Sequence, residues 1–166
     1  MEWMLMPLKR YAEFSGRSRR KEFWMYTLGV FILYVVMVIL FFVLGGSALM
    51  SMGSNPAGMA GAIMSMGAFG LIFLLVWLAL LIPTIAVTVR RLHDTDRSGW
   101  WLGALFGLAI LMQIAARMSS ALYMIVALAY LALAIALLVF YCLEGTKGPN
   151  RFGEDPKGAG AAEVFA

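Results

Sequence analysis

The sequence has little from which a metal or redox site could be built. Its 166 residues include one cysteine, Cys142, and one histidine, His93. A single cysteine excludes an intramolecular disulfide. A single histidine excludes a multi-histidine zinc or haem site within one chain. We therefore expect no bound cofactor.

Charged residues are also scarce. Only 13% of the residues are Asp, Glu, Lys or Arg, and 63% are hydrophobic, whereas soluble domains are about a quarter charged and about half apolar. The composition predicts a membrane protein. The net charge of +4 is better explained by charge sorting across a bilayer than by nucleic-acid binding, so no nucleic-acid partner is expected.

Four apolar segments are long enough to be membrane spans, since a helix needs roughly 20 residues to cross a hydrocarbon core of about 30 Å. The third is the shortest and carries Gln113, so a re-entrant helix is its alternative. We predict an all-α membrane protein, a four-transmembrane-helix bundle forming one domain, with an N-terminal segment 1–22 and a tail 144–166. The predicted spans are 23–44, 68–89, 100–116 and 120–143.

Basic residues are distributed unevenly between the loops. Twelve of the thirteen Lys and Arg residues precede the first span, separate the second from the third, or follow the fourth. Only Arg117 lies on the other side, and the loop Gly45–Gly67 has no charged residue. The positive-inside rule therefore predicts that both termini and the loop between the second and third spans are cytoplasmic.

Three segments are expected to depart from regular helix. Pro83 should kink the second span and free the carbonyl of Ala79, with Thr84 and Thr88 forming local hydrogen bonds. The loop Gly45–Gly67, rich in Gly, Ser and Met, is expected to be mobile or a broken helix. The tail after Gly145 is expected to be irregular.

Three polar blocks occur in a fixed order along the chain. They are FSGRSRRKEFW (Phe14–Trp24), PTIAVTVRRLHDTDRSGWW (Pro83–Trp101) and GTKGPNRFGEDP (Gly145–Pro156). Together they resemble domain-of-unknown-function family 805 of bacterial inner-membrane proteins, over about Leu8 to Pro156. Glu154 departs from the family pattern, where proline is common. The resemblance implies four spans and an uncharacterised activity, and it supplies no catalytic residue.

The three blocks all fall on the predicted cytoplasmic face, where they could form one polar site. A His–Asp pair could perform acid–base chemistry, but no nucleophile stands out beside it. We favour a structural or lipid-contacting connector, in which Asp94 and Asp96 pair with arginines, Ser98 caps the third helix and the tail folds back as a cover. The candidate residues are Arg19, Arg20, Arg90, Arg91, His93, Asp94, Asp96, Arg97 and Asn150, with Trp24, Trp100 and Trp101 as interfacial anchors.

Small residues recur at helical spacing in the last two spans. Such ridges let another helix approach closely. We favour packing of these two spans against each other, and the alternative is docking onto a partner protein or another copy of the chain. The residues are Gly99, Gly103 and Gly107 in the third span and Ala129, Ala132 and Ala136 in the fourth.

Methionines are concentrated in the first loop. Thioethers suit Cu(I), which makes Met50, Met52, Met64 and Met66 weak candidates for a metal site. The favoured interpretation is flexible apolar filler at the membrane surface.

These patterns together favour a non-enzymatic protein. We expect a scaffold, assembly factor or accessory subunit of a larger membrane complex, in contact with anionic lipid and with another membrane protein or its own copies. The alternative is a small transporter or channel. No Asp, Glu, Lys, Arg or His lies deep in a predicted span, and ion pathways usually carry such groups.

Overall fold

The described part of the chain forms five helices. The computed structural model describes residues 2–50 and 56–158, and for residues 44–49 the backbone alone. Over these residues the regular structure is helical apart from an isolated bridge between Asn150 and Gly153. The helices are α1 (Glu2–Lys9), α2 (Arg20–Met50), α3 (Pro56–Asp94), α4 (Trp100–Met118) and α5 (Ser120–Cys142).

Four helices are long and apolar enough to cross a membrane, which confirms the predicted all-α class. The candidate spans are Arg20–Val43, Pro56–Asp94, Trp100–Met118 and Ser120–Cys142. The second starts about twelve residues earlier than expected, because α2 and α3 both continue as helix into the loop that was expected to be mobile or broken. Residues 51–55 of that loop lie outside the described part. With 39 residues, α3 is about 58 Å long.

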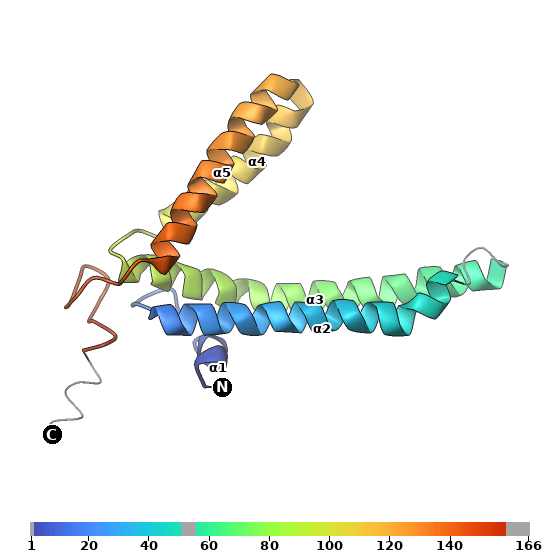
Figure 1. Cartoon of the computed structure of the whole chain (residues 1–166), viewed down its shortest axis with the longest axis horizontal. Helices are drawn as coiled ribbons and strands as arrows, with labels where there is room; N and C mark the ends of the chain where they lie inside the picture. The colour runs from blue at the N-terminus through green and yellow to red at the C-terminus, as the bar shows by residue number, and fades with distance from the viewer. Residues whose placement is uncertain (1, 51–55, 159–166) are drawn as a thin grey trace.

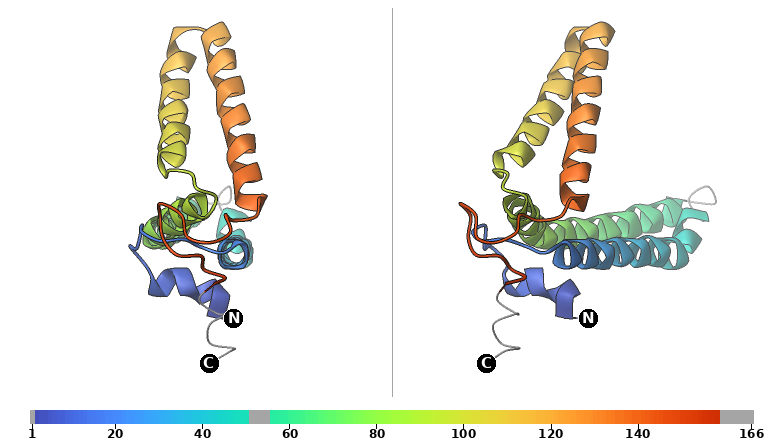
Figure 2. Two further views of the ribbon diagram at one scale, coloured as in Figure 1. Left: turned by 90° about the vertical axis from the view of Figure 1, so that its left-hand side faces the viewer. Right: turned by 60° about the vertical axis from the view of Figure 1, so that its left-hand side comes forward.

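The four long helices form two diverging hairpins rather than one closed bundle (Figures 1 and 2). Helix α2 packs mainly against α3, and α4 packs against α5. The α4–α5 turn is a single residue, Ser119, whose hydroxyl accepts a hydrogen bond from the Leu122 amide at 3.1 Å. The hairpins meet only at the end where α3 and α5 finish, so whatever fixes their relative position lies there.

Pro83 leaves the Ala79 carbonyl of α3 free, as predicted, and the kink stays a prediction. The carbonyl of Ala79 accepts a hydrogen bond from the Tyr11 hydroxyl at 2.7 Å, because the proline has no N–H to offer it. Thr84 and Thr88 donate to the carbonyls four residues earlier, each at 2.6 Å. The freed carbonyl therefore anchors the chain just after α1, which packs beside α2 and α3 (Figure 1).

The face of α4 that packs on α5 carries larger side chains than expected. Leu105, Leu108, Met112 and the fully buried Ala115 recur every three or four residues and are sheltered positions of the helix. On α5, Val126 and Leu137 are buried, whereas the alanines of the predicted ridge are not. Ala129 and Ala132 are exposed and Ala136 is half-buried.

The glycine ridge of α4 points away from α5, which corrects the expectation that it packs the last two spans together. A Cβ added at Gly107 would meet nothing within 4 Å, and one at Gly103 would meet only the Trp100 ring of its own helix, at 3.3 Å. Gly99 alone lies against another helix, with Val89 of α3 3.0 Å from an added Cβ. The leucines turn the opposite side of α4 toward α5, and this leaves the ridge uncovered.

Candidate functional site

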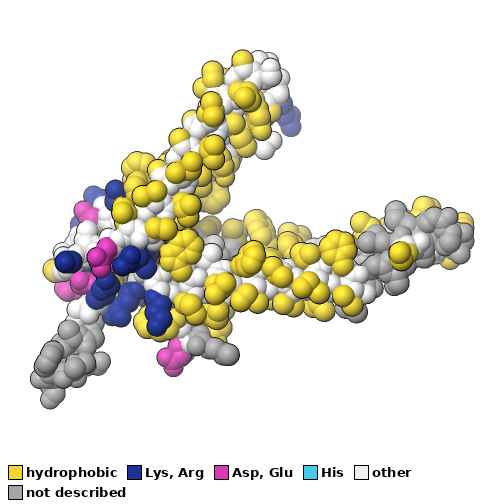
Figure 3. Space-filling view, viewed as in Figure 1, with side chains coloured by type: hydrophobic (Ala, Val, Ile, Leu, Met, Phe, Trp, Pro, Cys, Tyr) yellow, Lys and Arg dark blue, Asp and Glu magenta, His cyan; other side chains and the backbone are white. Residues whose placement is uncertain are grey.

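Three segments that are distant in sequence meet where the hairpins converge. They are the segment before and at the start of α2 (residues 13–22), the end of α3 with its following loop (90–97), and the tail after α5 (144–158). We call this region the polar junction. Figure 3 shows nearly all visible charged side chains gathered at this end, whereas the two arms are apolar.

The end of α3 explains why the segments meet. The last carbonyls of a helix have no partner within the helix, and here other segments supply the donors. The Ser18 amide donates to the Arg90 carbonyl at 3.1 Å, and the Thr146 amide donates to the Asp94 carbonyl at 2.8 Å. The side-chain amide of Asn150 donates to the His93 carbonyl at 2.9 Å. The tail thus folds back over α3.

Arginine side chains donate hydrogen bonds to the carbonyls at the end of α5. Arg91 donates from Nε to the Tyr141 carbonyl at 3.1 Å and from its terminal nitrogen to the Leu143 carbonyl. Arg20 donates to the Cys142 carbonyl at 3.3 Å. A cation at a helix C-terminus is also favoured by the helix dipole. Arg91 belongs to α3, so it joins the two hairpins directly.

Asp94 is the centre of the polar junction. Its carboxylate accepts hydrogen bonds from Arg17 Nε at 3.1 Å and from the Arg91 guanidinium. Arg17 also donates to the Gly148 carbonyl at 2.6 Å and to the Thr146 carbonyl at 2.5 Å. The Arg17 and Asp94 side chains are only 1% and 6% exposed. Removing one member of such a buried pair leaves an uncompensated charge and is strongly destabilising.

Gly145 lets the tail approach Asp94. A Cβ at this position would collide with the Asp94 carboxylate. Two buried arginines hold that carboxylate, so it cannot move aside. Glycine is therefore needed at position 145 because there is no room for a side chain, and not because of its backbone conformation.

A second buried ion pair joins α2 to α3. Arg90, which is fully buried, lies 3.3 Å from Glu22 and 3.8 Å from Glu13. Within the described residues, Arg90 Nε and one terminal nitrogen have no hydrogen-bond partner, and neither does the Ser18 hydroxyl. At this end of the α2–α3 hairpin, the two helices are thus held together by charge pairing more than by hydrogen bonds.

His93 is not paired with either neighbouring aspartate. Its Nδ1 lies 3.2 Å from the Gly16 carbonyl, and since a carbonyl only accepts, Nδ1 carries the hydrogen. The ring stacks on Phe152, with centroids 3.9 Å apart and planes inclined by 4°. Asp94 faces arginines, and Asp96 lies 3.1 Å from Arg151 of the tail. The His–Asp pair considered from the sequence is therefore not formed.

The remaining arginines of the predicted cluster lie at its rim. Arg19 donates to the Pro156 carbonyl of the tail. Arg97 donates to the Thr95 carbonyl at 3.1 Å and lies over the Phe140 ring, 3.8 Å from its centroid.

The predicted tryptophan anchors are exposed. Trp24 is 39% exposed and Trp100 is 83% exposed, and Trp101 packs edge-on against Phe140 at 5.5 Å.

The start of α4 differs slightly from expectation. Gly99, not Ser98, is the N-cap residue and precedes the first turn, although the Ser98 hydroxyl accepts a hydrogen bond from the Trp100 amide at 3.3 Å.

The methionines of the first loop lie at the opposite end of the molecule. Met50, Met64 and Met66 are exposed there, and Met52 lies outside the described residues. The copper site stays a prediction.

Several junction residues were not among the sequence candidates. The unforeseen members are Arg17, Glu22, Glu144, Gly145 and Thr146. Four of them stand inside the three polar blocks, and Glu144 directly precedes the third, so the blocks were the available signal. Gly145 and Thr146 carry no charge and act through small size and a backbone amide, so a search for charged groups could not find them.

The tail carries two carboxylates with altered acidity. A hydrogen bond from Lys157 Nζ, 2.8 Å from Glu144 Oε1, holds the pKa of Glu144 below its ordinary value. Asp155 accepts hydrogen bonds from the backbone amides of Lys157 at 2.9 Å and Gly148 at 3.0 Å, and these lower its pKa. The ionised carboxylates are the forms that accept these hydrogen bonds. Ionisation of Glu144 and Asp155 therefore stabilises the folded-back position of the tail.

These features define a polytopic helical membrane protein with its polar groups gathered at one end. The chain belongs to the family described as "Protein of unknown function (DUF805)", whose model matches residues 11–154. This confirms the resemblance noted in the sequence.

The chain is similar over nearly its whole length to inner membrane proteins of Escherichia coli (strain K12). It is 38% identical to inner membrane protein YhaH over 157 residues, covering 95% of this chain and 98% of YhaH. It is 34% identical to inner membrane protein YhaI over 157 residues, covering 95% and 97%. The uncharacterized protein YiiR is 30% identical over 152 residues, covering 86% and 84%. No solved structure matches. The protein is a multi-pass protein of the bacterial inner membrane.

Proposed function

We propose that this protein is a non-enzymatic scaffold or accessory subunit of a larger inner-membrane assembly. The observation that carries the proposal is the uncovered glycine face of α4. Gly107 is exposed, and nothing in the described chain lies within 4 Å of a Cβ placed there. Helix pairs in membranes associate through such small-residue faces, so a partner membrane protein or a second copy would pack against α4.

The state of the polar junction supports a structural role rather than catalysis. Asp94 is engaged by two arginines, and His93 by the Gly16 carbonyl and the Phe152 ring. Over the described residues no hydroxyl or thiol is hydrogen-bonded to His93, whereas nucleophilic catalysis needs a base within reach of a nucleophile. The two groups that acid–base chemistry would need, Asp94 and His93, are therefore engaged in contacts between segments of the chain.

A small transporter or channel is the weaker candidate. It would need a polar cavity between the spans. The groove between α3 and α4, of about 680 Å³, is lined mainly by apolar side chains such as Val89, Leu102 and Phe106, with His93 and Ser98 at its edge. This lining suits a lipid chain or an apolar helix better than an ion.

The polar junction would lie on the cytoplasmic side. The N-terminal segment and the tail are at the same end of the molecule (Figure 1), and twelve of the thirteen basic residues belong to that side. Anionic lipid attracts basic residues at the cytoplasmic surface. Arginine next to exposed Trp24 and Trp100 would supply contacts to headgroup phosphates.

Two substitutions at Gly107 test the proposed assembly. Gly107→Leu adds bulk to a face that meets no part of this chain, so the protein should fold and yet lose its partner. Gly107→Ala keeps the face small and should retain the partner. Native electrophoresis of each full-length variant in mild detergent, beside thermal unfolding, measures both properties. A Gly107→Leu protein that migrates like the wild type would contradict the proposal.

His93→Gln tests the enzymatic alternative. Glutamine keeps a side-chain N–H for the Gly16 carbonyl but cannot titrate near neutrality. The scaffold predicts near-normal folding and a near-normal cellular phenotype. A variant that folds fully and behaves in the cell as a deletion would favour acid–base chemistry instead.

A further inference from the structure

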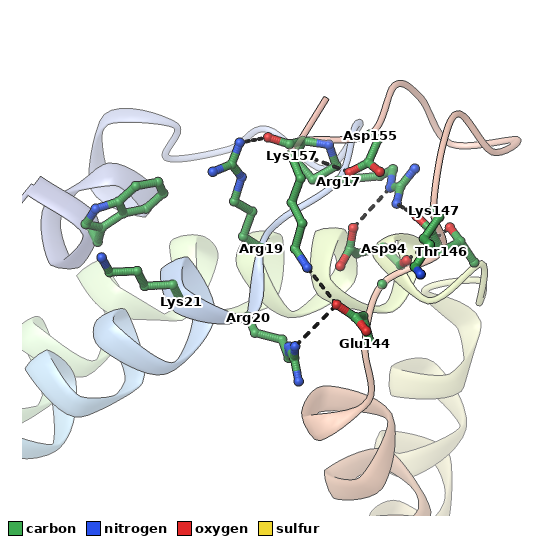
Figure 4. A pocket seen from close by; sticks show the side chains of 13 residues that line it. Arg17, Arg19, Arg20, Lys21, Asp94, Glu144, Thr146, Lys147, Asp155 and Lys157 are labelled. Atoms are coloured by element: carbon green, nitrogen blue, oxygen red, sulfur yellow. Dashed lines mark hydrogen bonds and ion pairs between the residues drawn. The ribbon is translucent and has the colours of Figure 1, made fainter. Parts of the chain in front are cut away.

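A pocket of about 500 Å³ lies within the polar junction. Its walls come from the start of α2, the residues just after α5 and the returning tail, with the Trp3 ring of α1 at one side (Figure 4). The apolar stretches of α2 and α5 end at this point, so a bilayer surrounding them would place the pocket near the depth of the lipid headgroups.

Basic side chains outnumber acidic ones in the pocket lining. The basic residues are Arg17, Arg19, Arg20, Lys21, Lys147 and Lys157, and the acidic residues are Asp94, Glu144 and Asp155. The excess of positive charge favours an anionic ligand.

The carboxylates of the pocket are already engaged. Asp94 is paired with Arg17 and Arg91. Glu144 lies 2.8 Å from Lys157 and 3.7 Å from Arg20. Asp155 accepts from two backbone amides, which fix its position but leave its negative charge, so the lining keeps six cations against three carboxylates.

Three cations remain without a carboxylate partner in the described part of the chain. Arg19 donates only to the Pro156 carbonyl and otherwise lies 5.9 Å from the centroid of the Trp3 ring. Lys21 is exposed and its Nζ lies 5.3 Å from the same centroid. Lys147 is exposed on the opposite wall and forms no ion pair. Figure 4 shows cationic side chains approaching the pocket from both α2 and the tail.

We propose that this basic pocket binds a phosphate group, carried either by a lipid headgroup or by a small soluble phosphate. Guanidinium and ammonium groups form strong charge-assisted hydrogen bonds with phosphate oxygens. The Trp3 ring closes one wall with an amphipathic surface suited to headgroup depth. The inference rests on the lipid contact in the proposed function and assigns that contact a place.

The test compares two double variants of the full-length protein. Lys21→Gln/Lys147→Gln removes two unpaired pocket cations, whereas Lys9→Gln/Arg117→Gln removes the same charge from exposed positions outside the pocket. Native mass spectrometry in neutral detergent measures binding of phosphatidylglycerol and of diacylglycerol, which has the same acyl chains and no phosphate. Calorimetric titration with inorganic phosphate measures binding of a soluble phosphate.

A lipid site predicts that the wild type retains phosphatidylglycerol over diacylglycerol. The pocket variant should lose about tenfold in that binding, and the control variant should change by no more than about twofold. A soluble-phosphate site predicts the same dependence for inorganic phosphate, with no preference between the lipids. Equal binding by the two variants, or no binding of either probe by the wild type, overturns the inference.

The assembly test at Gly107 separates this inference from the proposed function. If pocket substitution leaves phosphate binding intact while Gly107→Leu dissociates a complex, the pocket fails and the scaffold stands. If the pocket variant alone loses phosphate and Gly107→Leu changes nothing, the pocket stands and the scaffold fails.

Discussion

The two ends of the α2–α3 hairpin are built on opposite principles. At the polar junction, Arg90 and Arg91 are fully buried, and ion pairs and capped carbonyls connect three segments of the chain. At the far end, the stretch Gly45–Gly67 carries no charge, and Met50 and Met64 are 90% and 77% exposed. Among the described residues, most of the directional contacts that fix how the helices are placed therefore lie at the polar junction.

This difference shows where the fold is specified. Apolar side chains are nearly as well accommodated by lipid as by each other, so hydrophobic burial gives little reason for helices to meet inside a bilayer. Buried charges have no such freedom, because an unpaired one is very costly. The hairpins accordingly diverge where they are apolar and converge where they are charged.

The largest expected difference between the two ends is their side of the membrane. Alkaline phosphatase needs disulfides that form outside the cytoplasm. A fusion after Pro156 should be inactive, and a fusion near Asn55 should be active, because basic residues are retained inside. Enzyme activity in whole cells, corrected for fusion abundance, measures this. The reverse pattern would rule out a cytoplasmic polar junction.

Breaking the centre of the polar junction should give the next largest effect. Arg91→Ala removes one of the two arginine partners of Asp94 and the donors to α5, and should cost about 3–5 kcal/mol of unfolding free energy. Asp94→Ala should also destabilise. Because the two side chains interact, the double variant should lose less than the sum of the single losses. Detergent-induced unfolding measures all three. Strict additivity would show that the pair is not coupled.

A glycine comparison should give a smaller but selective effect. Gly145→Ala puts a methyl group into the Asp94 carboxylate, and should cost about 2–3 kcal/mol, as expected when a buried network is displaced. Gly107→Ala, on the uncovered face of α4, should change stability by no more than about 1 kcal/mol. Thermal unfolding of both proteins provides the measurement. Equal effects would mean that the tail does not pack on Asp94 in solution.

The smallest expected effect is the loosening of the tail in acid. The folded-state pKa values of Glu144 and Asp155 lie below their ordinary values of 4.5 and 3.8. Carboxylates shifted in this direction stabilise the folded tail above the ordinary values, and this contribution is lost as the pH falls through the lowered ones. Hydrogen exchange of the Gly148 amide, corrected for its intrinsic rate, should rise over that range. Asp155→Asn should remove most of the pH dependence, and a wild-type amide whose protection is constant with pH would contradict the assignment.

The sequence by itself determined the elements. Apolar length set the four spans, Pro83 freed the Ala79 carbonyl, and the uncharged stretch Gly45–Gly67 distinguished one end from the other. These properties depend on local composition and on the chemistry of the local backbone, and not on which residues lie nearby in space. The three polar blocks also identified the family and marked where most of the polar junction would form.

Only the tertiary structure decided which residues meet. The sequence placed Asp94 among arginines but not specifically between Arg17 and Arg91, and nothing local indicated that Gly145 makes room for its carboxylate. The glycine ridge of α4 could be read from spacing, but its direction could not, since that depends on which face the leucines turn toward α5. Pairings across more than fifty residues are set by how helix ends come together in space, and it is there that the unsatisfied carbonyls of α3 and α5 find their donors.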